Sequence, residues 1–241
     1  MKFKKNTFQF LIARHGESIW NKENRFTGWT DIPITKNGII QSNELAKTII
    51  KNKIKPYCIF TSELNRAIHT SDIIQKKLKT NIDIHKSWRL NEKSYGDCEG
   101  VNRDSLVKHT SKDYVSELRR SFFMIPPKLD NEMKYDFEEY QLNTNNYYLK
   151  NKIYNGETKE MVLHRMLPYW YEEIIPKIRD HCCPLIITHK HTARVLLKYL
   201  TKMPLIEFDN LDFPNGKIHH IRLNDEFFID NKEEDINILS S

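Results

Sequence analysis

Short apolar runs alternate with segments of helical periodicity along this chain, and few folds accommodate that alternation. The apolar runs lie at residues 8–13, 57–60 and 184–188. Helical spacing of apolar residues begins after a potential N-cap at Thr35 and again at Leu64. Short buried strands separated by helices predict an α/β protein with a mostly parallel sheet. The right-handed crossover rule then places helices on both faces of the sheet, as a three-layer α/β/α sandwich.

The second half of the chain continues this pattern with a longer helix. Apolar residues recur at helical spacing between Leu163 and Ile178, and a helix there must kink or restart at Pro168. Alternation at 217–223 predicts an edge strand, and residues 82–84 predict a short additional strand.

The length of 241 residues fits one domain spanning 1–241. One stretch, at about 126–156, is rich in Asn, Tyr and Lys and shows no clear period. A long irregular segment inside a compact domain usually covers a site or moves. We therefore expect this stretch to act as a lid.

Composition favours an ordered cytoplasmic protein. Apolar residues make up 39% and charged residues 29% of the chain, which argues against disorder. No apolar run approaches the ~20 residues that cross a bilayer, and the run behind the basic N-terminus is too short for a signal peptide. The four cysteines, at 58, 98, 182 and 183, have no CxxC spacing. We expect them to be reduced thiols, as in cytosolic proteins.

The net charge of +6 suits an anionic partner, such as nucleic acid, an acidic membrane surface or a phosphorylated metabolite. Lysine runs near the ends of predicted helices account for most of this charge, because cations there oppose the helix dipole and solvate the surface. Nothing resembling a helix-turn-helix, an RRM aromatic motif or a zinc finger focuses the charge on nucleic acid. We expect a small phosphorylated metabolite as the partner, with no nucleic acid and no membrane.

Two predicted strands each end in a histidine. His15 follows the run at 8–13, and His189 follows the run at 184–188. In parallel sheets the carboxyl ends of the strands form the ligand crevice. One such histidine is easily a core residue, but two with the same layout indicate a site.

The chemistry of this site follows from the motifs that the chain lacks. There is no HExxH or Cys/His cluster for zinc, no GxSxG elbow and no phosphate-binding loop. A histidine that itself attacks a phosphoryl group remains. Such a reaction needs cations around the phosphorus, and Arg14, Arg66 and His189 are candidates. Glu92 is the candidate proton donor and acceptor.

Several segments carry a resemblance to a known family. Residues 11–21 read LIARHGESIWN, which resembles the signature of the histidine phosphatase superfamily. Residues 23–31 read ENRFTGWTD, which is similar to the cofactor-dependent phosphoglycerate mutase branch. Further matching segments lie at 61–67, 88–92, 100–103, 119–127 and 167–176. The resemblance runs from about residue 8 to residue 224.

The resemblance implies a role for each matching position. His15 would be the phosphorylated nucleophile, and Glu92 would transfer the proton. Arg14, Arg66 and His189 would hold the phosphoryl group. The phosphates and the carboxylate of a phosphoglycerate would contact Ser18, Asn21, Thr27, Gly28, Tyr95, Arg103, Arg119 and Arg120. The implied activity is the interconversion of 3- and 2-phosphoglycerate in glycolysis.

The same resemblance implies that 2,3-bisphosphoglycerate primes the histidine and that no metal is needed. Many members assemble as dimers or tetramers, so a homodimer or homotetramer is possible.

Several positions depart from the mutase pattern. Lys190 and His191 stand where Gly and Asn are usual, and a glycine there lets a backbone amide approach phosphate closely. The side chain of Lys190 must turn away or add a cation, and we include it among the expected substrate-binding residues. Lys93 and Ser94 replace Arg-His before Tyr95. Arg103 stands where Lys is usual, with the same charge and a different geometry.

The changes at 190–191 favour a second interpretation, a phosphatase of the same superfamily that hydrolyses small phosphorylated metabolites. The chain also stops at Ser241, after an acidic stretch at 233–235, where the mutases extend a lysine-rich tail over the pocket. A nucleic-acid-binding module and a non-catalytic scaffold are the other readings. The presence of both His15 and Glu92 argues against a scaffold.

Overall fold

The computed structural model describes residues 8–128, 156–180 and 182–240. Its described strands form one sheet in the order β3-β2-β4-β1-β5-β6. The strands are β1 Phe8–Arg14, β2 Cys58–Thr61, β3 Asp83–Lys86, β4 Leu185–Thr188, β5 Ile218–Leu223 and β6 Ile236–Leu239. Pairs β1–β4, β4–β2 and β2–β3 are parallel, and β5 is antiparallel to both of its neighbours. The predicted mostly parallel sheet is confirmed.

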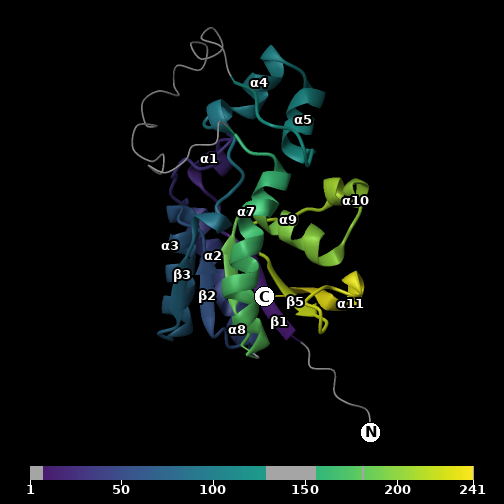
Figure 1. The fold of residues 1–241 in the computed structure, drawn as a ribbon. Coiled ribbons are helices and arrows are strands. Elements are labelled where there is room, and N and C mark those ends of the chain that lie inside the picture. The colour runs from purple at the N-terminus through teal and green to yellow at the C-terminus, as the bar shows by residue number, and fades with distance from the viewer. Residues whose placement is uncertain (1–7, 129–155, 181, 241) are drawn as a thin grey trace.

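Helices cover both faces of this sheet (Figure 1). The longer ones are α2 Lys36–Lys51, α3 Asn65–Leu78, α5 Lys112–Arg120, α7 Lys159–Tyr169 and α9 Lys190–Thr201. The shorter ones are α1 Ile19–Lys22, α4 Arg103–His109, α8 Ile175–Arg179, α10 Leu205–Asn210 and α11 Lys232–Asp235. In Figure 1, α4 and α5 lie together beyond one end of the sheet.

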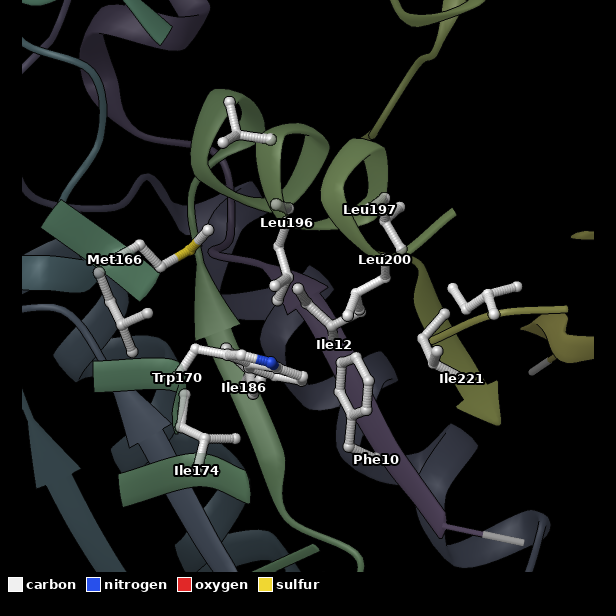
Figure 2. Packing of buried hydrophobic residues seen from close by; sticks show 14 of the residues in the cluster. Phe10, Ile12, Met166, Trp170, Ile174, Ile186, Leu196, Leu197, Leu200 and Ile221 are labelled. Carbon is white, nitrogen blue, oxygen red and sulfur yellow. The ribbon is translucent and has the colours of Figure 1, made fainter. Parts of the chain in front are cut away.

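Alternate side chains of the strands enter two separate cores, because successive residues of a strand point to opposite faces. Phe10 and Ile12 of β1 join the core under α7, α8 and α9, together with Trp170 and Leu196 (Figure 2). Leu11 and its neighbours on the opposite face pack against α2 and α3. These two cores give the three-layer α/β/α sandwich that the sequence predicts.

Local sequence explains where the helices begin and change. The Thr35 side chain accepts a hydrogen bond from Gly38 N and caps α2, as predicted. The helix predicted from Leu163 to Ile178 runs through Pro168 and is interrupted later, at a π turn over Trp170–Ile174. The turn ends two residues before Pro176, which lacks the N–H that a regular helix would use there.

The prediction of an edge strand at 217–223 was wrong. This strand is β5, and β6 pairs with it on the side away from β1. The α11 turn, whose N-cap is Asn231, returns the chain so that β6 runs alongside β5. Thus the acidic stretch at 233–235 belongs to the fold, and β6 is the edge.

The predicted lid, at about 126–156, lies largely outside the described residues. Its two described borders touch, because Gly156 packs against the ring of Pro126. A Cβ on Gly156 would lie 2.8 Å from Cδ of Pro126, and its φ of +97° also favours glycine. Residues on either side of the segment are therefore anchored at one place.

Two expectations from composition can be compared with the described residues. All four cysteines are free in the structure, as predicted. Across residues 8–128, 156–180 and 182–240, no helix has the length and apolar character to span a membrane.

Candidate active site

The two strand-terminal histidines meet at the carboxyl edge of the sheet. Because β1 and β4 are parallel neighbours in which Arg14 pairs with Thr188, the residues that follow them lie side by side. His15 N donates to Thr188 O at 3.0 Å, and the imidazole centroids of His15 and His189 are 4.9 Å apart. Both side chains are buried. The sheet thus brings together two imidazoles 174 positions apart in the sequence.

The His15 ring presents an unprotonated nitrogen. Its Nδ1 lies 2.6 Å from Gly16 O, and a carbonyl oxygen can only accept, so Nδ1 donates. In the neutral ring Nε2 then holds a free lone pair. Burial lowers the pKa of His15 well below its ordinary value, and Arg66 and Arg14 lower it further. Nε2 is therefore free to act as a nucleophile at neutral pH.

His189 is oriented by the end of the neighbouring strand. Its Nε2 lies 2.8 Å from Oγ of Ser62, which follows β2. Its Nδ1 is buried and has no hydrogen-bond partner among the described residues. Burial lowers the pKa of His189 well below its ordinary value, with a smaller effect from Arg66. This ring nitrogen at the sheet edge therefore has an unsatisfied capacity for hydrogen bonding.

Two arginines, the buried Arg66 and the half-buried Arg14, lie beside these rings. Arg66, in the first turn of α3, donates from Nη1 to Thr30 O at 2.9 Å and from Nη2 to Gly28 O at 2.6 Å. Burial lowers the pKa of Arg66 and of Arg14 to about 10, so both carry their charge at neutral pH. Arg14 Nε is buried without a partner in the part of the chain that the structure describes. These charges disfavour a protonated imidazole and favour an anion.

Gly28 is required by close packing as well as by conformation. It has a φ of +53°, and a Cβ there would lie 1.9 Å from the carboxylate of Glu99. That carboxylate accepts hydrogen bonds from the backbone of Trp29 and Thr30 and from Tyr95 N. Glu99 therefore ties the loop that holds Arg66 to the loop that carries Tyr95.

The Glu92 carboxylate lies at the N-terminus of α9. Oε1 accepts from Lys93 N at 2.9 Å and from His191 N at 3.1 Å. The Glu92 carbonyl accepts from the Trp29 indole at 2.6 Å. The acid is therefore held by backbone donors, and its position depends on the course of the 88–92 loop.

A buried ion pair fixes that loop. Arg165 of α7 binds Glu157, with 2.7 Å between Nε and Oε1. Its two terminal nitrogens donate to backbone carbonyls of the loop, at Arg89 (2.7 Å), Asn91 (2.9 Å) and Glu92 (3.0 Å). One side chain thus organises the segment that delivers the acid.

These groups open onto one cavity of about 230 Å³. Its lining residues are Arg14, His15, Glu17, Asn21, Thr27, Gly28, Arg66, Glu92, Tyr95, Arg103, Arg119, Lys190, His191 and Asn215. Most residues predicted for the site therefore converge on it. His189 lies against His15 behind this lining.

Two predicted binding residues lie elsewhere. The Ser18 side chain accepts from Asn21 N and caps α1, and it is fully buried away from the cavity lining. Arg120 lines adjoining cavities beside α5. Arg119 also lines one of these adjoining cavities, and of the two consecutive arginines it alone reaches the lining of the cavity beside His15.

Sequence reasoning did not include Glu17, His191 and Asn215 among the site residues. Asn215 Nδ2 donates to His15 O at 2.5 Å, across 200 positions of sequence, and no local pattern signals such a contact. Glu17 follows the His15-Gly16 pair directly, and His191 lies two residues after His189. Their proximity to the two histidines was the available signal.

Comparison with known families assigns the chain. The family described as the histidine phosphatase superfamily (branch 1) matches residues 10–134 and 127–230. The chain belongs to the histidine phosphatase superfamily. Its curated relatives include the 2,3-bisphosphoglycerate-dependent phosphoglycerate mutases of Buchnera aphidicola subsp. Cinara cedri and Blochmanniella floridana. The first is 39% identical over 87% of this chain and 90% of its own length, and the second is 36% identical over 86% and 88%.

Solved structures share the fold at lower identity. An alpha-ribazole phosphatase from Shigella flexneri matches with a TM-score of 0.68 and 21% identity, covering 97% of this chain and 96% of that one. A mycobacterial glucosyl-3-phosphoglycerate phosphatase matches with a TM-score of 0.69 and 18% identity, covering 97% and 96%. At these identities the likeness shows the fold alone.

Lys190 is one of the positions at which this chain departs from the mutase pattern. Its Nζ pairs with Asp212 at 2.6 Å, and the side chain also lines the cavity. The ammonium group of Lys190 is thus paired with Asp212, and the side chain still forms part of the cavity wall. In the described residues, no group of three His, Cys, Asp or Glu side chains is placed to bind a metal ion.

Proposed function

We propose that this protein is a 2,3-bisphosphoglycerate-dependent phosphoglycerate mutase, which interconverts 3- and 2-phosphoglycerate through a phosphohistidine at His15. The observation that carries the proposal is the distribution of charge in the cavity. Arg14 and Arg66 adjoin the His15 ring, and Arg103 and Arg119 line the same cavity. A ligand with one phosphoryl group to transfer and another anionic group to anchor matches this arrangement. The curated relatives at 34–39% identity support it.

His15 is the nucleophile in this proposal. Nε2 forms the bond to phosphorus as the bond between phosphorus and the donor oxygen breaks. The Nδ1–H group remains hydrogen-bonded to the Gly16 carbonyl. This hydrogen bond orients the His15 ring and stabilises the positive charge that develops on the ring. In the second half of the reaction the bond from Nε2 to phosphorus breaks, and the acceptor oxygen takes the phosphoryl group.

The surrounding cations stabilise the transferred group. Phosphoryl transfer spreads charge over three oxygens, so several fixed donors are needed at once. Arg14 and Arg66 supply guanidinium donors, and His189 supplies a ring nitrogen if its hydrogen lies on the unpartnered Nδ1. Because Arg66 already binds two carbonyls, it is preorganised and need not move.

Glu92 transfers the proton. It takes the hydrogen of the acceptor hydroxyl as that oxygen attacks, and returns a hydrogen to the leaving oxygen in the reverse sense. Backbone donors from Lys93 and His191 hold the carboxylate while its charge changes.

The residues present fit a bisphosphorylated primer. Three buried donor atoms of the lining, Arg14 Nε, Thr27 Oγ1 and Arg103 Nε, have no partner in the described structure. Buried donors are normally satisfied, so these atoms favour a ligand rich in acceptors. When bound, 2,3-bisphosphoglycerate would supply the phosphoryl group that first loads His15.

A phosphatase acting through the same phosphohistidine is the second candidate. The exchange of Gly-Asn for Lys190 and His191 favours it, because a cavity that holds the second substrate less tightly lets water reach the phosphohistidine. A change of ~1.4 kcal/mol in that discrimination alters the partitioning tenfold.

The test is to incubate the pure protein with 3-phosphoglycerate, with and without 2,3-bisphosphoglycerate, and to follow the products by ³¹P NMR. A mutase forms 2-phosphoglycerate, faster with the primer, and releases little phosphate. Steady release of phosphate without formation of 2-phosphoglycerate would contradict the mutase proposal and support the phosphatase.

A matched pair of variants identifies the nucleophile. His15→Ala should abolish acid-labile, base-stable phosphate on the protein and all turnover, whereas His164→Ala, at an exposed position of α7, should alter neither. Turnover that survives in His15→Ala would contradict both candidate functions.

The proposal also includes where the protein acts and how it assembles. We propose that it acts on small metabolites in the cytosol, as a homodimer or homotetramer. Subcellular fractionation would check the location, and light scattering would check the oligomeric state.

A further inference from the structure

His191 serves two groups of the cavity at once. It lies in the first turn of α9 and is 7% exposed. Its backbone N–H donates to the Glu92 carboxylate, so the main chain supports the acid. Its side chain faces Tyr95, with 2.8 Å between Nε2 and the tyrosine Oη. A substitution of the ring leaves the backbone contact with Glu92 available.

Arg194 determines which nitrogen of this ring carries the hydrogen. Its Nη1 lies 3.5 Å from Nδ1 of His191, and a guanidinium can only donate. Nδ1 is therefore the acceptor, and the hydrogen of the neutral ring resides on Nε2. Nη2 of Arg194 donates to Phe208 O at 2.5 Å, which holds the guanidinium in place.

The surroundings keep the ring neutral. Burial lowers the pKa of His191 well below its ordinary value, and Lys159 and Arg194 act in the same direction. A second proton on Nδ1 would also point at the Arg194 guanidinium. The ring therefore donates from Nε2 to the Tyr95 oxygen.

The Tyr95 hydroxyl accepts a hydrogen bond from His191, so its own proton can be donated to a different group. Burial and Glu92 raise the pKa of Tyr95, so the hydroxyl stays protonated. Among the described residues His191 is its hydrogen-bond partner, and an oxygen that accepts from His191 directs its proton elsewhere. Tyr95 lines the cavity beside Arg103 and Arg119, so the free proton can meet an anionic oxygen there.

We infer that His191 is a positioning residue: its Nε2–H fixes the Tyr95 hydroxyl as a donor to the anionic group of the substrate that is not transferred. This inference deepens the proposed function and rests on it for the identity of the ligand. The placement of the hydrogen on the ring does not depend on that identity.

The first experiment is ¹⁵N NMR of the protein labelled at histidine, at neutral pH. We expect the His191 signals of a neutral ring with a bare Nδ1 and a protonated Nε2. In Arg194→Met, where nothing donates to Nδ1, the other tautomer should become populated. A protonated Nδ1 in the unmodified protein would overturn the inference.

The second experiment compares two ligands by calorimetry. In His191→Phe the affinity for 3-phosphoglycerate should fall about tenfold, while that for inorganic phosphate, which occupies only the phosphoryl site, should stay the same. His191→Gln should restore most of the loss, because its amide nitrogen can donate in place of Nε2. In a Tyr95→Phe background the further change to Phe at 191 should have no effect.

Equal losses for both ligands, or an undiminished loss in the Tyr95→Phe background, would show that the ring only supports the fold. An unmodified protein that binds phosphate but no 3-phosphoglycerate would contradict the proposed function. In that case the NMR result alone decides the role of the ring.

Discussion

At the scale of single residues, burial determines the chemistry of this site. The imidazoles of His15 and His189 and the guanidinium of Arg66 are almost wholly withdrawn from water. A buried cation is tolerated when carbonyls satisfy it, and Gly28 and Thr30 do so for Arg66. The charge of Arg66 then acts at full strength on whatever occupies the cavity, because little water screens it.

The first prediction concerns this guanidinium. Arg66→Lys keeps the charge but cannot bind both carbonyls and still present a donor to phosphate. We expect the rate of phosphohistidine formation, measured by quenched flow with 2,3-bisphosphoglycerate, to fall about 10²-fold. Arg222→Lys, at an exposed position of β5, is the matched control and should leave the rate unchanged. A rate within twofold of the unmodified protein in Arg66→Lys would rule out this role.

The second prediction concerns pH. Burial, Arg66 and Arg14 lower the pKa of His15, so the ring stays unprotonated as the pH falls through 6.5, the ordinary value. In the proposed mechanism His15 therefore keeps an unprotonated Nε2 below pH 6.5. ¹⁵N NMR should show His15 of the folded protein titrating at lower pH than in the urea-unfolded chain. Titration of His15 at or above the pH seen in urea would contradict the electrostatic account.

Sequence reasoning at this scale succeeded where a strand or a helix start fixes a side chain. His15, His189 and Arg66 each lie within two residues of such a point. The sequence predicted a ligand contact for Ser18, whereas its side chain caps α1. A serine that caps a helix and a serine that binds a ligand look alike in sequence. Sequence reasoning also omitted Asn215, whose contact with His15 depends on the return of the chain through 200 positions.

At the scale of elements, the site depends on the 88–92 loop as well as on the ends of β1 and β4. Arg165 of α7 holds three carbonyls of this loop and the Glu157 carboxylate. The loop consists of one 3₁₀ turn at Trp88–Leu90 and the two residues after it, and the Arg165 side chain supplies donors to carbonyls that this short turn leaves without helical partners. Helix α7 thereby sets the position of Glu92, although it contributes nothing to the cavity lining.

The third prediction follows from this buried ion pair. Arg165→Met leaves Glu157 buried without its partner, and we expect the free energy of unfolding to fall by about 3–5 kcal/mol. The double variant Arg165→Met/Glu157→Leu should recover part of that loss, because no isolated charge remains. Urea denaturation measures both. A double variant no more stable than Arg165→Met would show that the loop carbonyls, and not the unpaired carboxylate, dominate the cost.

Periodicity predicted five of the six described strands and the long helices α2, α3 and α7, since both cores use alternate strand residues and one face of each of these helices. It did not predict α4, α5 and α10. It failed at β5 because edge status is a property of the whole sheet. Whether β5 lies at an edge depends on Ile236–Leu239, which follow an acidic turn and read as a tail. The π turn at Trp170–Ile174 was not predicted, because the sequence pattern places the interruption at Pro168.

At the scale of the whole molecule, buried histidines make the fold sensitive to acid. The pKa values of His15, His189, His191 and His219 are all lowered on folding. For a base whose pKa falls on folding, the unfolded chain binds more protons below pH 6.5. These groups therefore contribute stability that is complete above that pH and is lost as the pH falls toward their folded values.

The fourth prediction puts a size on this effect. Burial lowers the pKa of His219 to about 4 from 6.5, which corresponds to about 3 kcal/mol when fully expressed. His219 stacks on Phe213 outside the cavity, so His219→Gln can be studied without touching the site. Between pH 6.5 and 4, urea denaturation should show a shallower loss of stability in His219→Gln than in the unmodified protein. Parallel curves would mean that His219 does not contribute.

The contact between Gly156 and Pro126 has a consequence for the evolution of this chain. Gly156 and Pro126 hold the two ends of the intervening stretch together. The entropic cost of closing a loop between two fixed ends rises only slowly with the number of residues in the loop. The strands of the sheet and the two cores described above are formed by residues outside this stretch. We therefore expect relatives to differ in length between these two residues more than within the sheet or these two cores.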